Sequence, residues 1–248
     1  MPKPFLALPP PHCMFLLTAV LKMCFLQDSL SGNESNAYSF DEASPDGIGK
    51  YYMGREISKV MGHLGAGWLE RPQREREERT DLLVENLNLQ HSDQVVDLGA
   101  GSGYFTFRIA QKIPEGKVYA VDISKEMLGI VRAKIKKLDV ENVTPVHGTV
   151  TDFDVGSGTI DSILVVDAYH EFSHPLEMGK SIFEALKPGG QLVLIEYRLE
   201  DPLVPIKRLH KMSQKQAIKE LSATGLQWVK TLEFLPQQHF MIFQKPKS

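Results

Sequence analysis

Cysteine is scarce in this chain: its 248 residues include only Cys13 and Cys24. Beyond residue 24 the sequence therefore offers neither a disulfide framework nor a thiol nucleophile. Long apolar runs are also missing, because the stretches Phe5–Leu8 and Cys13–Leu21 are too short to span a bilayer as helices. There is no excess of basic residues, and a formal net charge of −3 argues against nucleic-acid binding, which needs a basic face.

The N-terminal region supports two interpretations. Residues 1–27 contain no acidic side chain, and Ser29-x-Ser31 after the second apolar stretch resembles a cleavage site. Early prolines and a weakly basic start argue against a signal peptide. We predict that residues 1–31 are a targeting or anchor segment or an extension that is not cleaved, with any membrane association confined to residues 1–27. Otherwise we expect a cytoplasmic protein, with residues 32–49 as a flexible linker rich in small and polar residues.

Strand and helix patterns alternate from residue 90 onwards, which predicts an α/β domain with a parallel sheet over residues 90–248. The expected strands are Gln94–Leu98, Lys117–Ile123, Val143–His147, Ile160–Asp167 and Gln191–Tyr197. The expected helices are Tyr104–Ile113, Lys125–Leu138, Pro175–Leu186 and Ser213–Thr224. Two last strands, Leu226–Leu235 and His239–Lys245, should pair as an antiparallel hairpin at the sheet edge.

Residues 50–89 precede this domain and are predicted to be helical. One helix is expected over Tyr51–Leu69, interrupted by glycines, and a longer one over Arg71–Leu89. The second begins with alternating charges, which normally form a solvated face. We expect this region to form a lid or wall over the substrate. Its candidate contacts are Tyr51, Tyr52, Arg55 and Trp68, although core packing is the preferred interpretation for Trp68.

The most informative segment is a glycine turn. The apolar run Val95–Leu98 reads as a buried strand, and it leads into Gly99-x-Gly101-x-Gly103 and then a helical pattern. Glycines let the backbone approach a ligand closely, and the following helix presents free N–H groups. Dinucleotide-binding turns have the spacing G-x-G-x-x-G. The G-x-G-x-G spacing, with Asp97 before it, instead resembles motif I of the class I S-adenosylmethionine (SAM) methyltransferases.

This resemblance, which continues in the segment Leu186–Gly190, implies a Rossmann-like fold. Its sheet would have seven mostly parallel strands with a reversed last strand, helices on both faces and SAM bound at the carboxyl ends. Asp122, about twenty residues beyond the glycines, can accept hydrogen bonds from both ribose hydroxyls. The resemblance places Asp152 at the adenine amino group and Asp167 at the methionine end. The residues expected to hold SAM are Asp97, Gly99, Ala100, Gly101, Gly103, Asp122, Ile123, Met127, Asp152 and Asp167.

Candidate catalytic residues follow the fourth strand of the predicted sheet. Tyr169 and His170 should face the substrate, with His170 as a general base or an orienting donor, unless it only makes a structural hydrogen bond. Glu196, Tyr197 and Arg198 are weaker pocket candidates, and His210 and His239 are more easily explained as structural histidines. Asp167 is not followed by the proline pair that relatives acting on adenine amines or protein amides carry. The resemblance therefore implies a small organic acceptor, as in the quinone-type branch.

Two other functions compete with methyl transfer. His170-Glu171-x-x-His174 formally matches the zinc-protease motif H-E-x-x-H, which needs one continuous helix. Pro175 should be the first residue of a new helix, so the motif would cross a loop and we expect no bound metal. The second alternative is a protein that binds SAM but does not transfer its methyl group. The sequence leaves the oligomeric state open.

Overall fold

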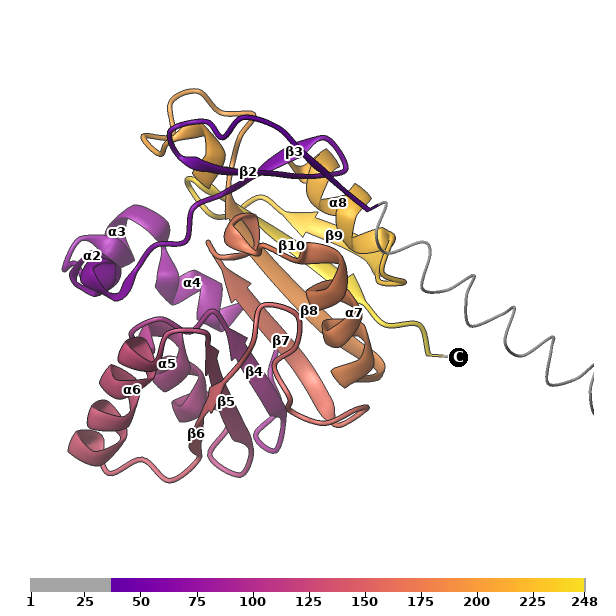
Figure 1. Ribbon diagram of the computed structural model, residues 1–248. Coiled ribbons are helices and arrows are strands. Elements are labelled where there is room, and N and C mark those ends of the chain that lie inside the picture. The colour runs from indigo at the N-terminus through magenta and orange to yellow at the C-terminus, as the bar shows by residue number, and fades with distance from the viewer. Residues whose placement is uncertain (1–36, 248) are drawn as a thin grey trace, which may run out of the picture. The chain divides into compact units, whose positions relative to one another are not determined.

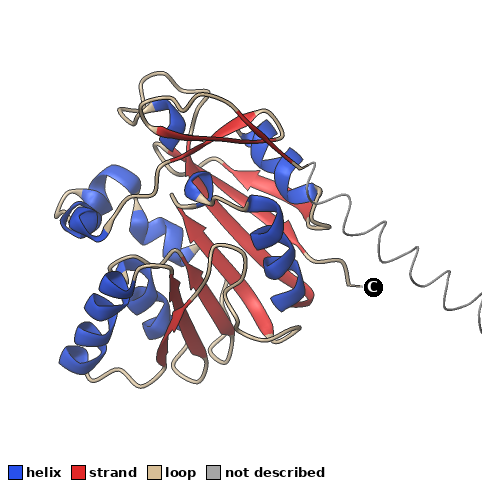
Figure 2. Cartoon of the chain, in the orientation of Figure 1, coloured by secondary structure: helices blue, strands red, loops and turns tan. Residues whose placement is uncertain are grey.

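A computed structural model of the chain describes residues 37–247, so the expected segment 1–31 lies outside the described part. Its core is a seven-stranded sheet of order β6-β5-β4-β7-β8-β10-β9 (Figures 1 and 2). The strands are β4 (Gln94–Leu98), β5 (Lys117–Asp122), β6 (Val143–His147), β7 (Ile160–Val166), β8 (Leu186–Tyr197), β9 (Gln227–Leu232) and β10 (Gln238–Gln244). The pairs among β4 to β8 are parallel, whereas β10 runs antiparallel to both β8 and β9. This confirms the predicted sheet and its reversed C-terminal hairpin.

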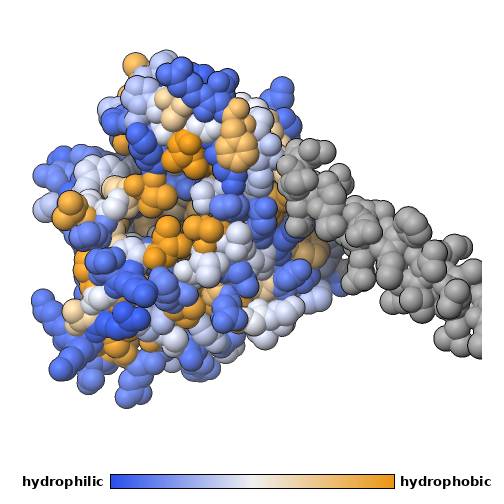
Figure 3. Space-filling view, viewed as in Figure 1, coloured by the Kyte–Doolittle hydropathy of each residue, from blue (hydrophilic) through white to orange (hydrophobic). Residues whose placement is uncertain are grey.

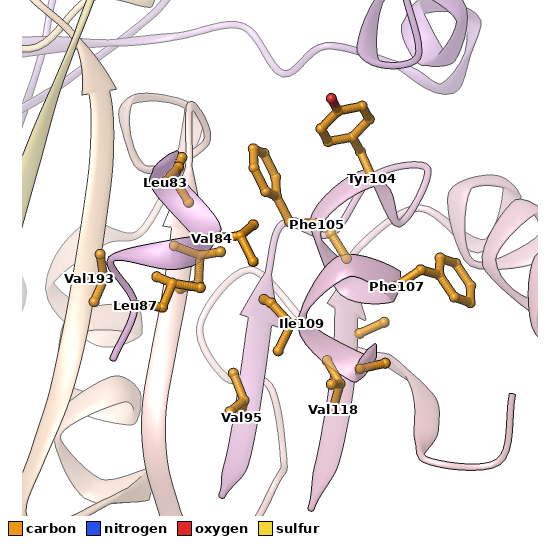
Figure 4. Close-up of a cluster of buried hydrophobic side chains, with 14 of the residues drawn as sticks. Leu83, Val84, Leu87, Val95, Tyr104, Phe105, Phe107, Ile109, Val118 and Val193 are labelled. Atoms are coloured by element: carbon orange, nitrogen blue, oxygen red, sulfur yellow. The ribbon is translucent and has the colours of Figure 1, made fainter. Parts of the chain in front are cut away.

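Helices cover both faces of this sheet. Figure 1 shows α5 (Tyr104–Lys112) and α6 (Lys125–Leu138) on one side, and α7 (Pro175–Ala185) and α8 (Gln214–Ser222) on the other. Strand residues alternate between the two cores, because successive side chains of a strand point to opposite faces. Thus Val95 belongs to the cluster under α5 (Figure 4), and Val96 belongs to the cluster under α7 and α8. Among residues 37–247, no helix is long and apolar enough to cross a membrane.

Helix α6 shows why the core could be predicted so closely. Its start is fixed by Ser124, whose hydroxyl accepts a hydrogen bond from the Met127 amide at 3.1 Å. Its end is fixed by Asp139, which adopts a left-handed conformation with a φ of 52°. The other predicted core elements are all present with small shifts at their ends. The largest shift is in β8, which begins at Leu186 because this residue already pairs with Ile160 of β7.

The helix expected over Tyr51–Leu69 was wrong. The structure has an antiparallel hairpin there, formed by β2 (Gly47–Tyr52) and β3 (Arg55–Ser58). Met53 and Gly54 make its turn with φ values of 50° and 93°, which a helix cannot accommodate. The hairpin is tied to α8 by an ion pair of 2.7 Å between Arg55 and Glu220. After β3 the chain forms two short helices, η1 (His63–Gly65) and α2 (Ala66–Leu69). Part of the segment expected to be a flexible linker also forms strands, namely β1 (Tyr38–Phe40) and the start of β2.

The single helix expected over Arg71–Leu89 was also wrong. The chain forms two short helices, α3 (Arg74–Glu78) and α4 (Thr80–Glu85), because Arg79 between them has a φ of 52°. The break accompanies burial of charge: Glu78 is fully buried and accepts hydrogen bonds from Arg71 at 2.5 Å and Arg74 at 3.0 Å. The charged stretch is therefore partly an interior ion cluster, and Arg74 with its 3% exposure is not part of a solvated face.

Candidate functional site

A cavity of about 800 Å³ lies at the carboxyl ends of β4, β5 and β7, where open α/β sheets bind their ligands. Its walls come from the glycine turn, the end of β5, the loop 148–150, the 3-10 helix η2 (Tyr169–Glu171) and two loops farther away in sequence, 59–63 and 205–207. Figure 3 shows apolar side chains bordering a hollow on this face. The cavity is therefore a largely apolar site with a few polar groups, the composition typical of small-molecule sites.

The glycine turn forms one wall of the cavity. Gly99 and Gly101 line it with φ values of 76° and 53°. A Cβ at Gly99 would lie 2.8 Å from the Cβ of Ala168, and one at Gly101 would lie 2.7 Å from Leu69 Cδ1. Larger residues would therefore be strained and would crowd the turn. Of the other expected turn residues, Ala100 and Gly103 do not line the cavity; Gly103 instead caps the N-terminus of α5.

Asp122 stands at the end of β5 and faces the cavity. Its Oδ2 accepts a hydrogen bond from the Gly101 amide and its Oδ1 accepts one from the Ser124 amide, both at 2.8 Å. Burial is the largest influence on this group and raises the pKa of the carboxyl. Ile123 and Met127, which the sequence analysis assigns to the cofactor, line the same cavity. Each carboxylate oxygen has a further lone pair, so Asp122 can still accept bonds from a ligand.

Two of the predicted cofactor acids are turned away from the cavity. Asp97 is buried beneath the glycine turn, where its Oδ2 accepts a hydrogen bond from the Thr106 hydroxyl at 2.5 Å and so joins β4 to α5. Burial raises the pKa of Asp97 to about 6. Asp152 accepts a hydrogen bond from Ser181 of α7 at 2.6 Å. Thr149 of the same loop, which the sequence analysis did not single out, lies on the cavity wall instead.

Asp167 reaches the cavity from the end of β7 with an unusual backbone conformation, a φ of 48°. Its Oδ2 accepts a hydrogen bond from the Gln238 side-chain amide at 2.7 Å. Its Oδ1 is buried and has no hydrogen-bond partner among the described residues. Burial, and then the nearby carboxylates of Glu78 and Glu196, raise the pKa of Asp167 well above its usual value. A buried acceptor without a partner is costly, which points to a donor supplied by a ligand.

His170 lies on the cavity wall and is held by a buried carboxylate. Its Nδ1 is 2.6 Å from Glu196 Oε2, and its Nε2 is 3.2 Å from His210 Nδ1. A carboxylate on one ring nitrogen fixes the tautomer, and the other nitrogen, Nε2, can act on a ligand that replaces its contact with His210. Tyr169 does not share this position, because its side chain is fully buried, packs against the Phe172 ring at 5.5 Å and lies outside the cavity lining.

The structure confirms that the zinc-protease motif over residues 170–174 crosses a loop. Residues Tyr169–Glu171 form one turn of 3-10 helix, and His174 is the residue that precedes α7. The two histidines of the motif are therefore not on one face of a continuous helix. Instead Glu171 and His210 approach His170, a grouping that the sequence spacing did not indicate.

The position of Trp68 differs from the core packing that the sequence analysis preferred. Its side chain is 39% exposed and lines the cavity.

The seven-stranded sheet and the cavity at the carboxyl ends of its strands have the architecture of a Rossmann-like methyltransferase fold. The chain belongs to the family described as "Methyltransferase domain", which it matches over residues 89–239. A demethylmenaquinone methyltransferase of Lactococcus lactis is 33% identical over 113 residues, covering 45% of this chain and 44% of the relative. One from a Geobacillus strain is 26% identical over 114 residues, covering 46% and 49%. The chain thus spans about half the length of the curated relatives it matches.

Solved structures show the same fold at low sequence identity. A SAM-dependent methyltransferase from Aquifex aeolicus superposes with a TM-score of 0.71 at 21% identity, over 75% of this chain and 100% of the other. A putative type 11 methyltransferase from Sulfolobus solfataricus gives a TM-score of 0.57 at 18% identity, over 69% and 95%. At these identities the likeness concerns the fold, so the acceptor must be inferred from the site itself.

Proposed function

We propose that the protein transfers the methyl group of SAM to a small, mainly apolar organic acceptor that carries a hydroxyl or phenol group. The observation that carries this proposal is the arrangement of one cavity. The glycine turn and Asp122 lie at one part of its wall, and His170, held by the buried Glu196, lies at another. A cofactor and an acceptor bound side by side in such a cavity can meet for transfer.

The residues present fit SAM at both of its ends. Asp122 has acceptor capacity for the two ribose hydroxyls, and the apolar side chains of Ile123 and Met127 can border the adenine ring. At the other end, the partnerless Oδ1 of Asp167 can accept a hydrogen bond from the ammonium group of the methionine part. The bound cofactor would supply a methyl group activated by the sulfonium charge.

The acceptor end combines a proton-accepting group with apolar walls. His170, with its Glu196 partner, would orient the acceptor hydroxyl or take its proton. Val60, Met61, Phe172 and Ile206 line the cavity around it and suit an uncharged, flat or branched molecule. The names of two relatives, both demethylmenaquinone methyltransferases, also point to an apolar acceptor. We therefore place simple phenols and hydroquinones first among candidate acceptors.

The test measures cofactor binding and methyl transfer separately. SAM is titrated calorimetrically into the full-length protein, and transfer of a labelled methyl group is then followed with a panel of phenols and hydroquinones. His170→Asn should keep SAM affinity but lower kcat by about 10²–10⁴-fold, the usual contribution of a positioned acid or base. His174→Asn is the matched control, because His174 does not line the cavity. Its SAM affinity and its kcat should both equal those of the wild type.

Each failure has a separate meaning. A folded wild-type protein that does not bind SAM would overturn the proposal as a whole. Binding of SAM without transfer to any phenol, hydroquinone or component of a small-molecule extract would favour the alternative of a SAM-binding protein without turnover. An unchanged kcat in His170→Asn, with transfer intact in the wild type, would remove His170 from the reaction and leave the cofactor assignment in place.

A further inference from the structure

We infer that His170, Glu171 and His210 form a binding site for one divalent transition-metal ion, of which Zn²⁺ is the best fit. Three atoms make the site: His170 Nε2, His210 Nδ1 and Glu171 Oε1. They are separated by 3.2 Å between the two nitrogens, 3.8 Å from His170 to Glu171 and 3.5 Å from His210 to Glu171. A point equidistant from the three lies about 2.0 Å from each, which matches the bonds of about 2.0–2.2 Å that Zn²⁺ makes to nitrogen and oxygen.

Neighbouring groups hold two of the three ligands, His170 and Glu171, in their orientation. Glu196 contacts His170 Nδ1 at 2.6 Å, so the ring presents Nε2 to the centre of the triangle. The Met61 amide donates to Glu171 Oε2 at 3.1 Å and leaves Oε1 directed at the two imidazoles. A carboxylate on the second nitrogen of a ligating histidine is the common supporting contact in metal sites. This contact is independent of the triangle and points to the same use of His170.

The hydrogen bond between the two imidazoles is compatible with a metal ion at this place. If Nδ1–H of His170 donates to Glu196, its Nε2 carries a lone pair, and the short contact to His210 needs one proton on Nδ1 of that ring. A divalent ion would replace that single proton and bond both lone pairs and the carboxylate. Two histidines and one carboxylate suit Zn²⁺ and its first-row neighbours, and three protein ligands leave a fourth position open.

The open position would face the acceptor. All three ligand residues line the same cavity as Gly99, Gly101 and Asp122. This part of the inference rests on the proposed function: the ion would bind the acceptor oxygen and lower its pKa, so that the hydroxyl proton leaves to water. The resulting oxyanion would form the bond to the methyl carbon as the bond from that carbon to sulfur breaks. In the metal-loaded protein His170 is then a ligand, and the ion replaces it as the group that activates the hydroxyl.

The site is different from the sequence motif that shares two of its residues. H-E-x-x-H would use His174, whereas the fold brings in His210, which the chain delivers through the 3-10 helix η3 (Arg208–His210). The two histidine rings lie 5.3 Å apart at an angle of 86°. The inference also revises the expectation from the sequence that no metal is bound.

Metal titration of the full-length protein tests the site without reference to catalysis. The protein is treated with a chelator, dialysed and titrated with Zn²⁺ by calorimetry, and with Co²⁺ while the visible absorption of its d–d bands is followed. We expect one ion per chain and an absorption typical of tetrahedral nitrogen and oxygen coordination. Glu171→Gln and His210→Asn should each weaken binding by about 100-fold or more, and Glu196→Gln by about 10–100-fold. His174→Asn, the matched control, should bind like wild type.

The outcomes distinguish this inference from the proposed function. Equal Zn²⁺ affinity in wild type, Glu171→Gln and His210→Asn would overturn the site, as would a wild type that takes up no ion. SAM is titrated into the same chelated samples, so SAM binding without metal binding overturns only the metal site. Metal binding without SAM binding overturns only the proposed function. Thermal unfolding of the metal-free variants, expected near that of the metal-free wild type, ensures that a loss of binding is not a loss of folding.

Discussion

Asp122 and Asp152 are two acids that the sequence assigns to the same cofactor, and the structure separates them. Asp122 faces the cavity, whereas Asp152 is bonded to Ser181. Asp122→Ala would remove two hydrogen bonds between a carboxylate and the ribose hydroxyls of SAM. Each bond of this kind contributes about 1.5–3 kcal/mol, so the pair accounts for about 3–6 kcal/mol. We therefore expect SAM affinity to fall by roughly 10²–10⁴-fold.

Isothermal titration of SAM into wild type, Asp122→Ala and Asp152→Ala measures this difference directly. Asp152→Ala is the matched control, since it removes the same group from a residue outside the cavity lining, and its affinity should change by less than about threefold. Asp122→Ala also leaves the Gly101 and Ser124 amides without their acceptor, so circular dichroism must show that the variant is folded. Equal losses in the two variants, or a folded Asp122→Ala that keeps its affinity, would refute the placement of SAM.

Three further predictions concern stability and the turn. Glu78→Gln breaks a fully buried ion cluster with Arg74 and should lower the free energy of unfolding by about 3–5 kcal/mol, measured by urea denaturation. The pKa of Asp97 rises to about 6 on folding, so the native state takes up a proton more readily than the unfolded chain. Stability should therefore fall by about 2–3 kcal/mol as the pH rises from 4 to 6, and Asp97→Asn should flatten this profile. Gly99→Ala forces a φ of 76° on alanine and a contact with Ala168, so it should lower both stability, by about 1–2 kcal/mol, and SAM affinity.

Local signals explain how much of the core could be predicted from the sequence. Each predicted strand of the sheet is a short apolar run bounded by turn residues, and each predicted helix has an apolar face and recognisable ends, such as Ser124 before α6. These signals lie within a few residues of one another, so no knowledge of tertiary contacts is needed. The antiparallel hairpin of β9 and β10 was predictable for the same reason, since a short polar turn separates two apolar runs.

The N-terminal part was mispredicted because its structure depends on distant partners. The hairpin of β2 and β3 has its own turn signal in Met53-Gly54, which lies inside the stretch predicted as a helix. Its burial depends on Arg55 finding Glu220, which is far away in sequence. In the same way Glu78 enters the interior because Arg71, Arg74 and the Tyr197 hydroxyl surround it. A charged stretch carries no local sign of whether such partners will be present.

The candidate site likewise has one part that depends on local sequence signals and another that depends on tertiary contacts. Gly99, Gly101 and Asp122 were predictable because backbone conformation and strand ends, both local properties, decide where they lie. Tyr169 was not, because neighbouring residues after a strand can point in opposite directions, and only the fold decides that His170 faces the cavity. The grouping of His170 with Glu171, Glu196 and His210 needs three separate segments to meet at one sheet edge. A linear motif can propose only His174 as the partner of His170, since spacing reports on one helix at a time. The proposed chemistry of the acceptor therefore depends on the part of the site that tertiary structure creates, whereas the proposed cofactor site depends on residues that can be identified in the sequence.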